Sequence, residues 1–101
     1  MRLIIFFDLP SVTNEEKKNY RHFIKLLKTE GLYMMQESVY TKLAVTPYVT
    51  KSTINSIQKN LPPCGHISAL TVTEKQFNDI CLLLGGKKSE VIDSVESILE
   101  L

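Results

Sequence analysis

The sequence predicts a single α+β domain in which two helices cover one face of a four-stranded antiparallel sheet. Three observations support this prediction. An apolar run typical of a buried strand opens the chain, two segments with helical spacing lie between start and stop signals, and the β-rich segments between them alternate in polarity. With 101 residues, the chain is long enough for one hydrophobic core and too short for a second domain.

The first predicted strand spans residues 3–7, five consecutive apolar residues that suit a central strand buried on both faces. It ends at Asp8, because Pro10 cannot donate a hydrogen bond to a sheet. Asp8 is therefore the first candidate site residue. It is either a turn residue whose carboxylate accepts bonds from nearby amides or a metal ligand.

The metal interpretation of Asp8 has a requirement. No second carboxylate or histidine stands within a few residues of it, whereas a hard divalent cation usually takes one or two carboxylates plus water. A twofold axis would bring Asp8 of two chains together and supply the second carboxylate. The metal interpretation therefore depends on a symmetric dimer.

The first helix is predicted over residues 14–29. Thr13 and Glu16 have the spacing of a capping box, and Gly31 follows as a stop signal. The stripe predicted to face the sheet consists of Tyr20, Phe23, Ile24 and Leu27.

Another flank of this helix is basic. No acid occurs between Glu16 and Glu30, and like charges at this spacing oppose helix formation by roughly a few tenths of a kcal/mol per pair. The flank is either an ordinary solvated lysine face or a surface for phosphate groups. Its members are Lys17, Lys18, Arg21, His22, Lys25 and Lys28.

Residues 32–45 are β-rich and too long for one central strand, so we divide them near Gln36-Glu37 into two antiparallel strands or a bulged ribbon. Alternation places Tyr40 and Lys42 on one face of the second of these strands. They could contact a ligand or a second subunit, but we expect ordinary surface residues. A second helix is expected between Thr46-Pro47 and Pro62-Pro63. Its predicted apolar line is Ile54, Ile57 and Leu61.

Residues 65–73 read as the last strand of the sheet. His66, near its start, has no evident partner in the sequence, and a structural or solvent-facing role is the expected one. Thr73 and Gln76 form a second capping box, which opens a short helix.

The predicted order βαββαβ is that of the ferredoxin-like fold. We assign residues 1–80 to this core and residues 81–101 to a C-terminal extension of the same domain. A sheet of this type has one open face, and residues 89–101 are the candidate to cover it, in this chain or in a partner. Their apolar spacing fits either a helix or an edge strand.

The charges are divided unevenly along the chain. The net charge is only +1, but residues 1–88 hold all 12 Lys and Arg and 7 of the 11 acids, a net of +5, while residues 89–101 carry −4. If the acidic tail lies away from the basic face, a dimer would present two basic bodies that attract a polyanion such as nucleic acid. The alternative is that the opposite charges of the two segments average out in solution.

Composition also indicates where the protein works. No segment approaches the roughly 18 apolar residues of a membrane span and no signal peptide precedes the first strand, so we expect a cytoplasmic protein without membrane contact. The two cysteines, Cys64 and Cys81, have no metal-ligand spacing, and we expect them to be reduced thiols.

Three stretches in this order, Phe6-Phe7-Asp8-Leu9-Pro10, residues 34–40 (MMQESVY) and residues 70–77 (LTVTEKQF), make the sequence similar to the CRISPR-associated Cas-two (Cas2) family. They most resemble the branch that accompanies type II-A systems. The resemblance implies a homodimer of ferredoxin-like subunits in which Asp8 faces its twin across the dimer axis.

The resemblance also implies a function in spacer acquisition, the adaptation step of CRISPR defence. In the family, the dimer bridges two dimers of the Cas-one (Cas1) integrase and holds the double-stranded DNA that becomes a new spacer, the prespacer. Lys17, Lys18, Arg21 and Lys25 would then contact duplex phosphates without reading bases.

Two alternatives come from other functional classes. Cas2 proteins are also described as metal-dependent endonucleases acting on RNA or duplex DNA, which would make the paired Asp8 carboxylates catalytic ligands of Mg²⁺ or Mn²⁺. A ferredoxin-like RNA-binding module is the second alternative, but such modules stack bases on aromatic residues of the sheet, and the sequence lacks that signature.

Overall fold

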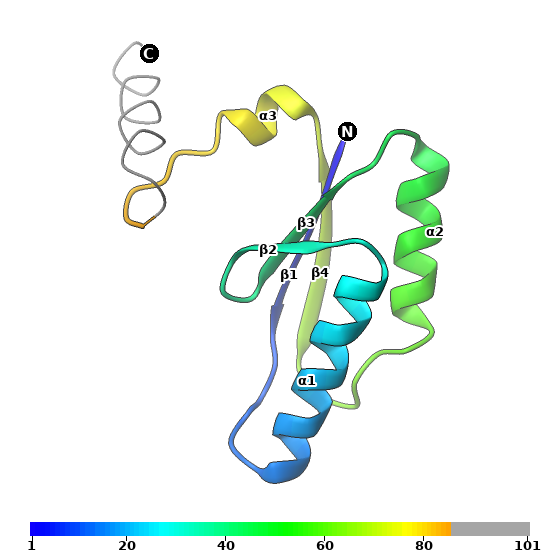
Figure 1. Ribbon diagram of the computed structural model, residues 1–101, viewed down its shortest axis with the longest axis vertical. Coiled ribbons are helices and arrows are strands. Elements are labelled where there is room, and N and C mark those ends of the chain that lie inside the picture. Colours follow the sequence, from blue (N-terminus) through cyan, green and yellow to red (C-terminus); the bar gives the residue numbers. More distant parts are fainter. Residues whose placement is uncertain (86–101) are drawn as a thin grey trace.

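The computed structural model describes residues 1–85 and confirms the predicted order of elements (Figure 1). A short helix, α3, follows the βαββαβ core. The bounds are β1 (Arg2–Asp8), α1 (Asn14–Thr29), β2 (Tyr33–Gln36), β3 (Val39–Leu43), α2 (Pro47–Gln58), β4 (His66–Val72) and α3 (Glu74–Asn78).

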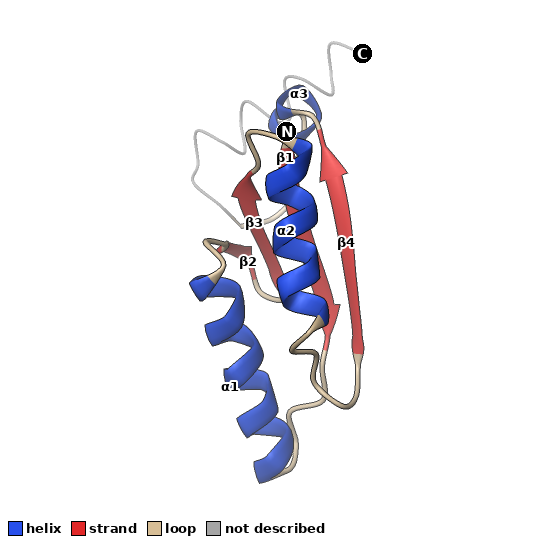
Figure 2. Ribbon diagram, turned by 90° about the vertical axis from the view of Figure 1, so that its right-hand side faces the viewer, coloured by secondary structure: helices blue, strands red, loops and turns tan. Residues whose placement is uncertain are grey.

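The four strands form one antiparallel sheet in the order β2-β3-β1-β4. As predicted, β1 is an inner strand, hydrogen-bonded to β3 on one side and to β4 on the other. Helices α1 and α2 lie side by side over one face of this sheet (Figure 2). We call the other face, which neither helix covers, the open face.

Local signals explain both ends of α1. Thr13 accepts a hydrogen bond from the Glu16 amide, and the Glu16 carboxylate accepts one from the Thr13 amide, which completes the capping box and lowers the pKa of Glu16. At the other end, Gly31 has φ +88°, and the amides of Gly31 and Leu32 donate to the carbonyls of Lys28 and Leu27. This is a Schellman motif, whose left-handed position favours glycine.

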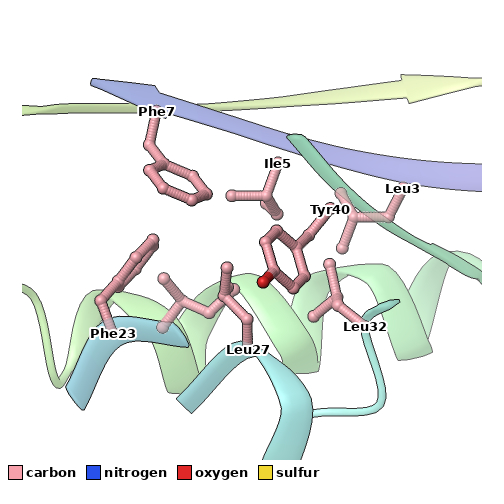
Figure 3. Close-up of a cluster of buried hydrophobic side chains, with 8 residues drawn as sticks. Leu3, Ile5, Phe7, Phe23, Leu27, Leu32 and Tyr40 are labelled. Carbon is pink, nitrogen blue, oxygen red and sulfur yellow. The ribbon is translucent and has the colours of Figure 1, made fainter. Parts of the chain in front are cut away.

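The hydrophobic core lies between the sheet and the two helices (Figure 3). Phe7 of β1 packs edge-on against Phe23 of α1, with 5.0 Å between the ring centroids. Tyr20 and Ile24 pack against the margin of this cluster, so the predicted apolar stripe of α1 is confirmed. The core consists of Leu3, Ile5, Phe7, Phe23, Leu27, Leu32, Tyr40 and Ile57.

Tyr40 corrects the prediction for β3. It is 4% exposed and lies in the core, because β3 is an inner strand and its Tyr40 face is the face that the helices cover. Burial accordingly raises the pKa of the Tyr40 hydroxyl. Lys42, on the same face, is half-buried, and its ammonium group donates to the Glu30 carbonyl and the Thr53 hydroxyl.

Two further predictions about packing were wrong. Leu61 is 50% exposed, because α2 ends at Gln58 and the chain leaves the helix before Leu61 can join its apolar line. Phe6 is 44% exposed, because it points to the open face of the sheet rather than into a second core. The first strand is therefore buried on both faces only in part.

Helix α3 is attached to the start of β1 through Arg2. The Arg2 guanidinium donates to both carboxylate oxygens of Glu74, at 3.1 and 3.0 Å, and lies 4.2 Å from the centroid of the Phe77 ring. It also donates to the Tyr33 hydroxyl of β2. Its pKa is raised, chiefly by the hydrogen bonds to Glu74.

Only part of the predicted C-terminal extension can be compared with the structure. Residues 86–101 lie outside the described part of the chain, and with them the expected cover of the sheet by residues 89–101. The boundary of the core at residue 80 stays a prediction. Within residues 1–85, no helix is long and apolar enough to cross a membrane.

Candidate functional site

Asp8 is the last residue of β1 and is exposed. Successive side chains of a strand point to opposite faces, and Leu3, Ile5 and Phe7 point into the core. Asp8 therefore shares the open face with Phe6. This position leaves the carboxylate accessible to a ligand or to a second protein chain.

The sheet places His66 beside Asp8. His66 is the first residue of β4 and the direct partner of Asp8 in the antiparallel register. Residues opposite each other in such a pair have Cβ atoms about 4.5–5.5 Å apart and share a face. His66 is also exposed, and no hydrogen bond or ion pair joins the two side chains within residues 1–85.

The pairing of His66 with Asp8 is the feature of this region that sequence reasoning missed. The signal that could have found it was the fold itself. Once the ferredoxin-like order is assumed, the last strand runs antiparallel to the first, so the start of the last strand lies beside the end of the first. His66 and Asp8 occupy those two positions.

Asp8 and His66 line one shallow concavity of about 280 Å³ on the sheet. Two hydroxyl groups, those of Ser38 and Ser68, also border it. The concavity therefore combines a carboxylate, an imidazole and two hydroxyls over an apolar base. Its lining residues are Phe6, Phe7, Asp8, Ser38, Val39, His66 and Ser68.

Backbone geometry holds the margins of this concavity close together. Gly65 has φ +106°, and a Cβ atom at this position would lie 2.8 Å from the Asp8 carbonyl oxygen and 2.5 Å from Cδ2 of Leu9. Ser38 has φ +65° in the turn between β2 and β3, and its carbonyl accepts a 3.1 Å hydrogen bond from the Phe7 amide. Both the turn and the start of β4 are thus fixed against the end of β1.

The donor set of one chain does not complete a magnesium site. No group of three or more His, Cys, Asp and Glu side chains suited to a metal occurs among residues 1–85. Asp8 contributes one carboxylate and His66 one imidazole, while Mg²⁺ is usually held by oxygen ligands. Mg²⁺ or Mn²⁺ at Asp8 would therefore require donors from a second copy of the chain.

The predicted phosphate-contacting residues lie together on α1. Lys17, Lys18, Arg21 and Lys25 are all exposed, and none of the four forms an ion pair with another described residue. Lys25 also borders a groove between α1 and the loop before β4, together with His22 and Asn60. None of the residues that line this groove is acidic. The flank therefore presents uncompensated positive charge to the solvent.

The Asp8 concavity and the basic flank are separate features. Asp8 lies on the open face of the sheet, by alternation with the core residues of β1. Helix α1 covers the opposite face (Figure 2). The structure thus brings Asp8 together with His66 but not with the basic residues of α1. Fold and site define a ferredoxin-like α+β protein with a cationic helix on one face of its sheet and a carboxylate–imidazole pair on the other.

Comparison with known proteins gives the family. Residues 1–80 match the family model described as CRISPR associated protein Cas2. The chain is 46% identical over its whole length to a protein of Ligilactobacillus salivarius and 43% identical to one of Treponema denticola, each covered completely. It is also 43% identical over 93% of its length to a protein of Streptococcus mutans, of which the match covers 86%. All three relatives are named CRISPR-associated endoribonuclease Cas2.

This chain belongs to the CRISPR-associated Cas2 family, a family of CRISPR adaptation proteins.

Proposed function

We propose that this protein acts in spacer acquisition as a homodimeric scaffold, which bridges dimers of the Cas1 integrase and holds the prespacer duplex by its phosphate backbone. The observation that carries the proposal is the uncompensated basic flank of α1. A protein with this task would work in the cytoplasm, where it can reach both chromosomal and invading DNA.

The basic flank of α1 is suited to binding a duplex independently of its base sequence. Lysine and arginine side chains on one side of a helix contact phosphates, and phosphate contacts position a duplex without reporting its bases. New spacers differ in sequence, so a scaffold for their capture must accept any duplex. The flank meets this requirement because its contacts depend on charge and shape alone.

The open face of the sheet supports the dimer. It carries large apolar side chains that remain half-exposed in the single chain, among them Phe6 (44%) and Leu70 (50%). Leu70 of β4 is the register partner of Ile4 on the inner strand β1, and Phe6 lies two residues further along the same face of β1, so Phe6 and Leu70 lie in one area of the open face. Apolar side chains gathered in this way are typical of a protein–protein interface.

The salt dependence of duplex binding tests whether the basic flank contacts phosphates. Each phosphate contact that is lost should lower the slope of log affinity against log salt concentration by about one. For Arg21→Ala we expect the slope to decrease by about one for each subunit of the dimer. The decrease should be the same for duplexes of unrelated sequence. The matched control is Lys51→Ala, which removes one exposed positive charge from α2 outside the flank. If both variants keep the wild-type slope, Arg21 makes no phosphate contact.

A metal-dependent endonuclease is the second candidate function. The names of the relatives favour it, and so does the exposure of Asp8 at the end of β1. Asp8 and its copy would be the catalytic ligands of Mg²⁺ or Mn²⁺, and the substrate would be RNA or duplex DNA. Because one chain supplies a single carboxylate there, this activity requires the dimer in which the two Asp8 side chains meet.

A further inference from the structure

We propose that one strand of the bound duplex lies in the groove between α1 and the loop before β4, with Asn60 as a phosphate contact outside the basic flank. We call this groove the α1 groove. The assignment rests on the proposed function and adds a second element, the loop after α2, to the surface that contacts the duplex.

The α1 groove has two walls, which come from different elements, and a volume of about 550 Å³. One side of α1 forms the first wall, and residues 60–63 form the second. The second wall ends in Pro62-Pro63, whose φ angles are fixed by their rings, so it is formed before a ligand arrives and binding does not have to order it. The polar residues of the first wall are Asn19, His22, Lys25 and Thr29.

Both walls carry hydrogen-bond donors that are available to a ligand. His22 and Lys25 are exposed, and within residues 1–85 their side chains form no hydrogen bond or ion pair. Asn60 is also exposed, and its side-chain nitrogen donates to the Ser56 carbonyl at 3.0 Å, which orients the amide and leaves its second hydrogen for a ligand. Ammonium and amide groups are common phosphate contacts, and a neutral imidazole also keeps one N–H donor.

The charges around the α1 groove indicate which part of it a phosphate strand can occupy. No acid lines the groove itself, whereas an adjoining hollow that shares Asn19 and Pro62-Pro63 with it is lined by Glu15 and Glu16. Carboxylates repel phosphates, so the strand would follow the wall from Thr29 and leave it at Asn19. Lys25 belongs to the groove and to the basic flank, so this path continues directly into the surface of the proposed function.

The test introduces a charge on the loop wall and measures the affinity of the full chain for a labelled DNA duplex of arbitrary sequence. At about 0.15 M salt the screening length is about 8 Å, so a new charge acts mainly on phosphates close to it. We expect Asn60→Lys to strengthen duplex binding and Asn60→Asp to weaken it, each by roughly threefold or more. Asn60→Lys should also steepen the salt dependence of log affinity by about one for each subunit.

Asn55 supplies the matched control, because it is an exposed asparagine of α2 that does not line the α1 groove. Asn55→Lys and Asn55→Asp should each change the duplex affinity by less than about twofold. Circular dichroism and light scattering check the fold and the oligomeric state of every variant. Damage to the fold would weaken binding in both Asn60 variants, so opposite effects of lysine and aspartate distinguish a phosphate contact from a structural role.

Two results would overturn the assignment: equal changes at residues 60 and 55, or an Asn60→Lys protein of unchanged fold that does not bind the duplex more tightly than wild type. Arg21→Ala, measured in parallel, tests the proposed function separately. A wild-type salt dependence in Arg21→Ala contradicts the phosphate contact of the basic flank. A reduced salt dependence in Arg21→Ala, together with Asn60 variants that match their Asn55 counterparts, refutes the groove assignment alone.

Discussion

At the residue scale, the placement of Asp8 beside His66 depends on a glycine that carries no chemistry of its own. Gly65 precedes β4 with a positive φ, and its backbone lies against the Asp8 carbonyl and the Leu9 side chain. A larger residue there would force β4 away from the end of β1. The distance between Asp8 and His66 is therefore controlled from the adjacent position.

We expect Gly65→Ala to destabilise the protein by more than the roughly 1–3 kcal/mol of a strained left-handed residue, because it adds a steric clash with backbone and Leu9 to that strain. The measurement is denaturant unfolding. Gly31→Ala is the matched control, since Gly31 also has a positive φ but its Cβ would meet only the Lys42 side chain at 3.6 Å. Equal losses of stability in the two variants would show that the close approach at Gly65 is unimportant.

What the sequence could predict at this scale depended on the range of each interaction. The Thr13–Glu16 capping box was confirmed because its partners are three residues apart and need no tertiary structure. The pairing of Asp8 with His66 was missed because it depends on the register between strands far apart in the chain. Tyr40 was placed on the wrong face because alternation separates two faces of a strand without showing which one the helices cover.

At the element scale, the long helices and strands were predictable and the attachment of α3 was not. The bounds of α1 agree with prediction at both ends, because the capping box and Gly31 mark them locally. The capping box of α3 was also visible in the sequence. Its anchoring by Arg2 was not, since that contact joins residues 2 and 74 across the folded sheet.

We expect Arg2→Lys to loosen α3 while leaving α1 intact. Lysine keeps the charge but loses the two-pronged contact with Glu74 and the planar stack on Phe77, a cost of about 1 kcal/mol in local stability. Hydrogen exchange should therefore become faster at the Phe77 and Asp79 amides, whose acceptors are Thr73 and Lys75. Arg21→Lys makes the same substitution at an exposed site and should have no such effect. Unchanged exchange at α3 in Arg2→Lys would contradict this role of Arg2.

At the scale of the whole molecule, the two faces of the sheet have different assignments. The face covered by helices presents the basic flank of α1 to solvent, and the open face presents half-exposed apolar residues with Asp8 and His66 at one end. A dimer formed through the open face would leave the basic flank of each chain free for a duplex. The basic flank and the Asp8–His66 pair therefore lie on different surfaces of the molecule.

The same division limits what could be predicted of the candidate site. The basic flank could be located from helical spacing alone, and the structure places its members together on α1. Asp8 could be singled out because it ends an apolar strand. The other polar residues around Asp8 could not be predicted, because they lie on β4 (His66 and Ser68) and in the turn before β3 (Ser38). Only the folded sheet brings these segments to the end of β1.

The most direct test of the scaffold proposal is spacer integration in a reconstituted mixture with the cognate Cas1, after light scattering has shown that each variant remains a dimer. We expect Asp8→Ala to retain integration and the double variant Arg21→Ala, Lys25→Ala to lose most of it, because the scaffold needs the phosphate grip and not metal-dependent cleavage. Loss of integration by a dimeric Asp8→Ala protein, with integration retained by the double variant, would contradict the proposal and make the Asp8 site essential for the reaction.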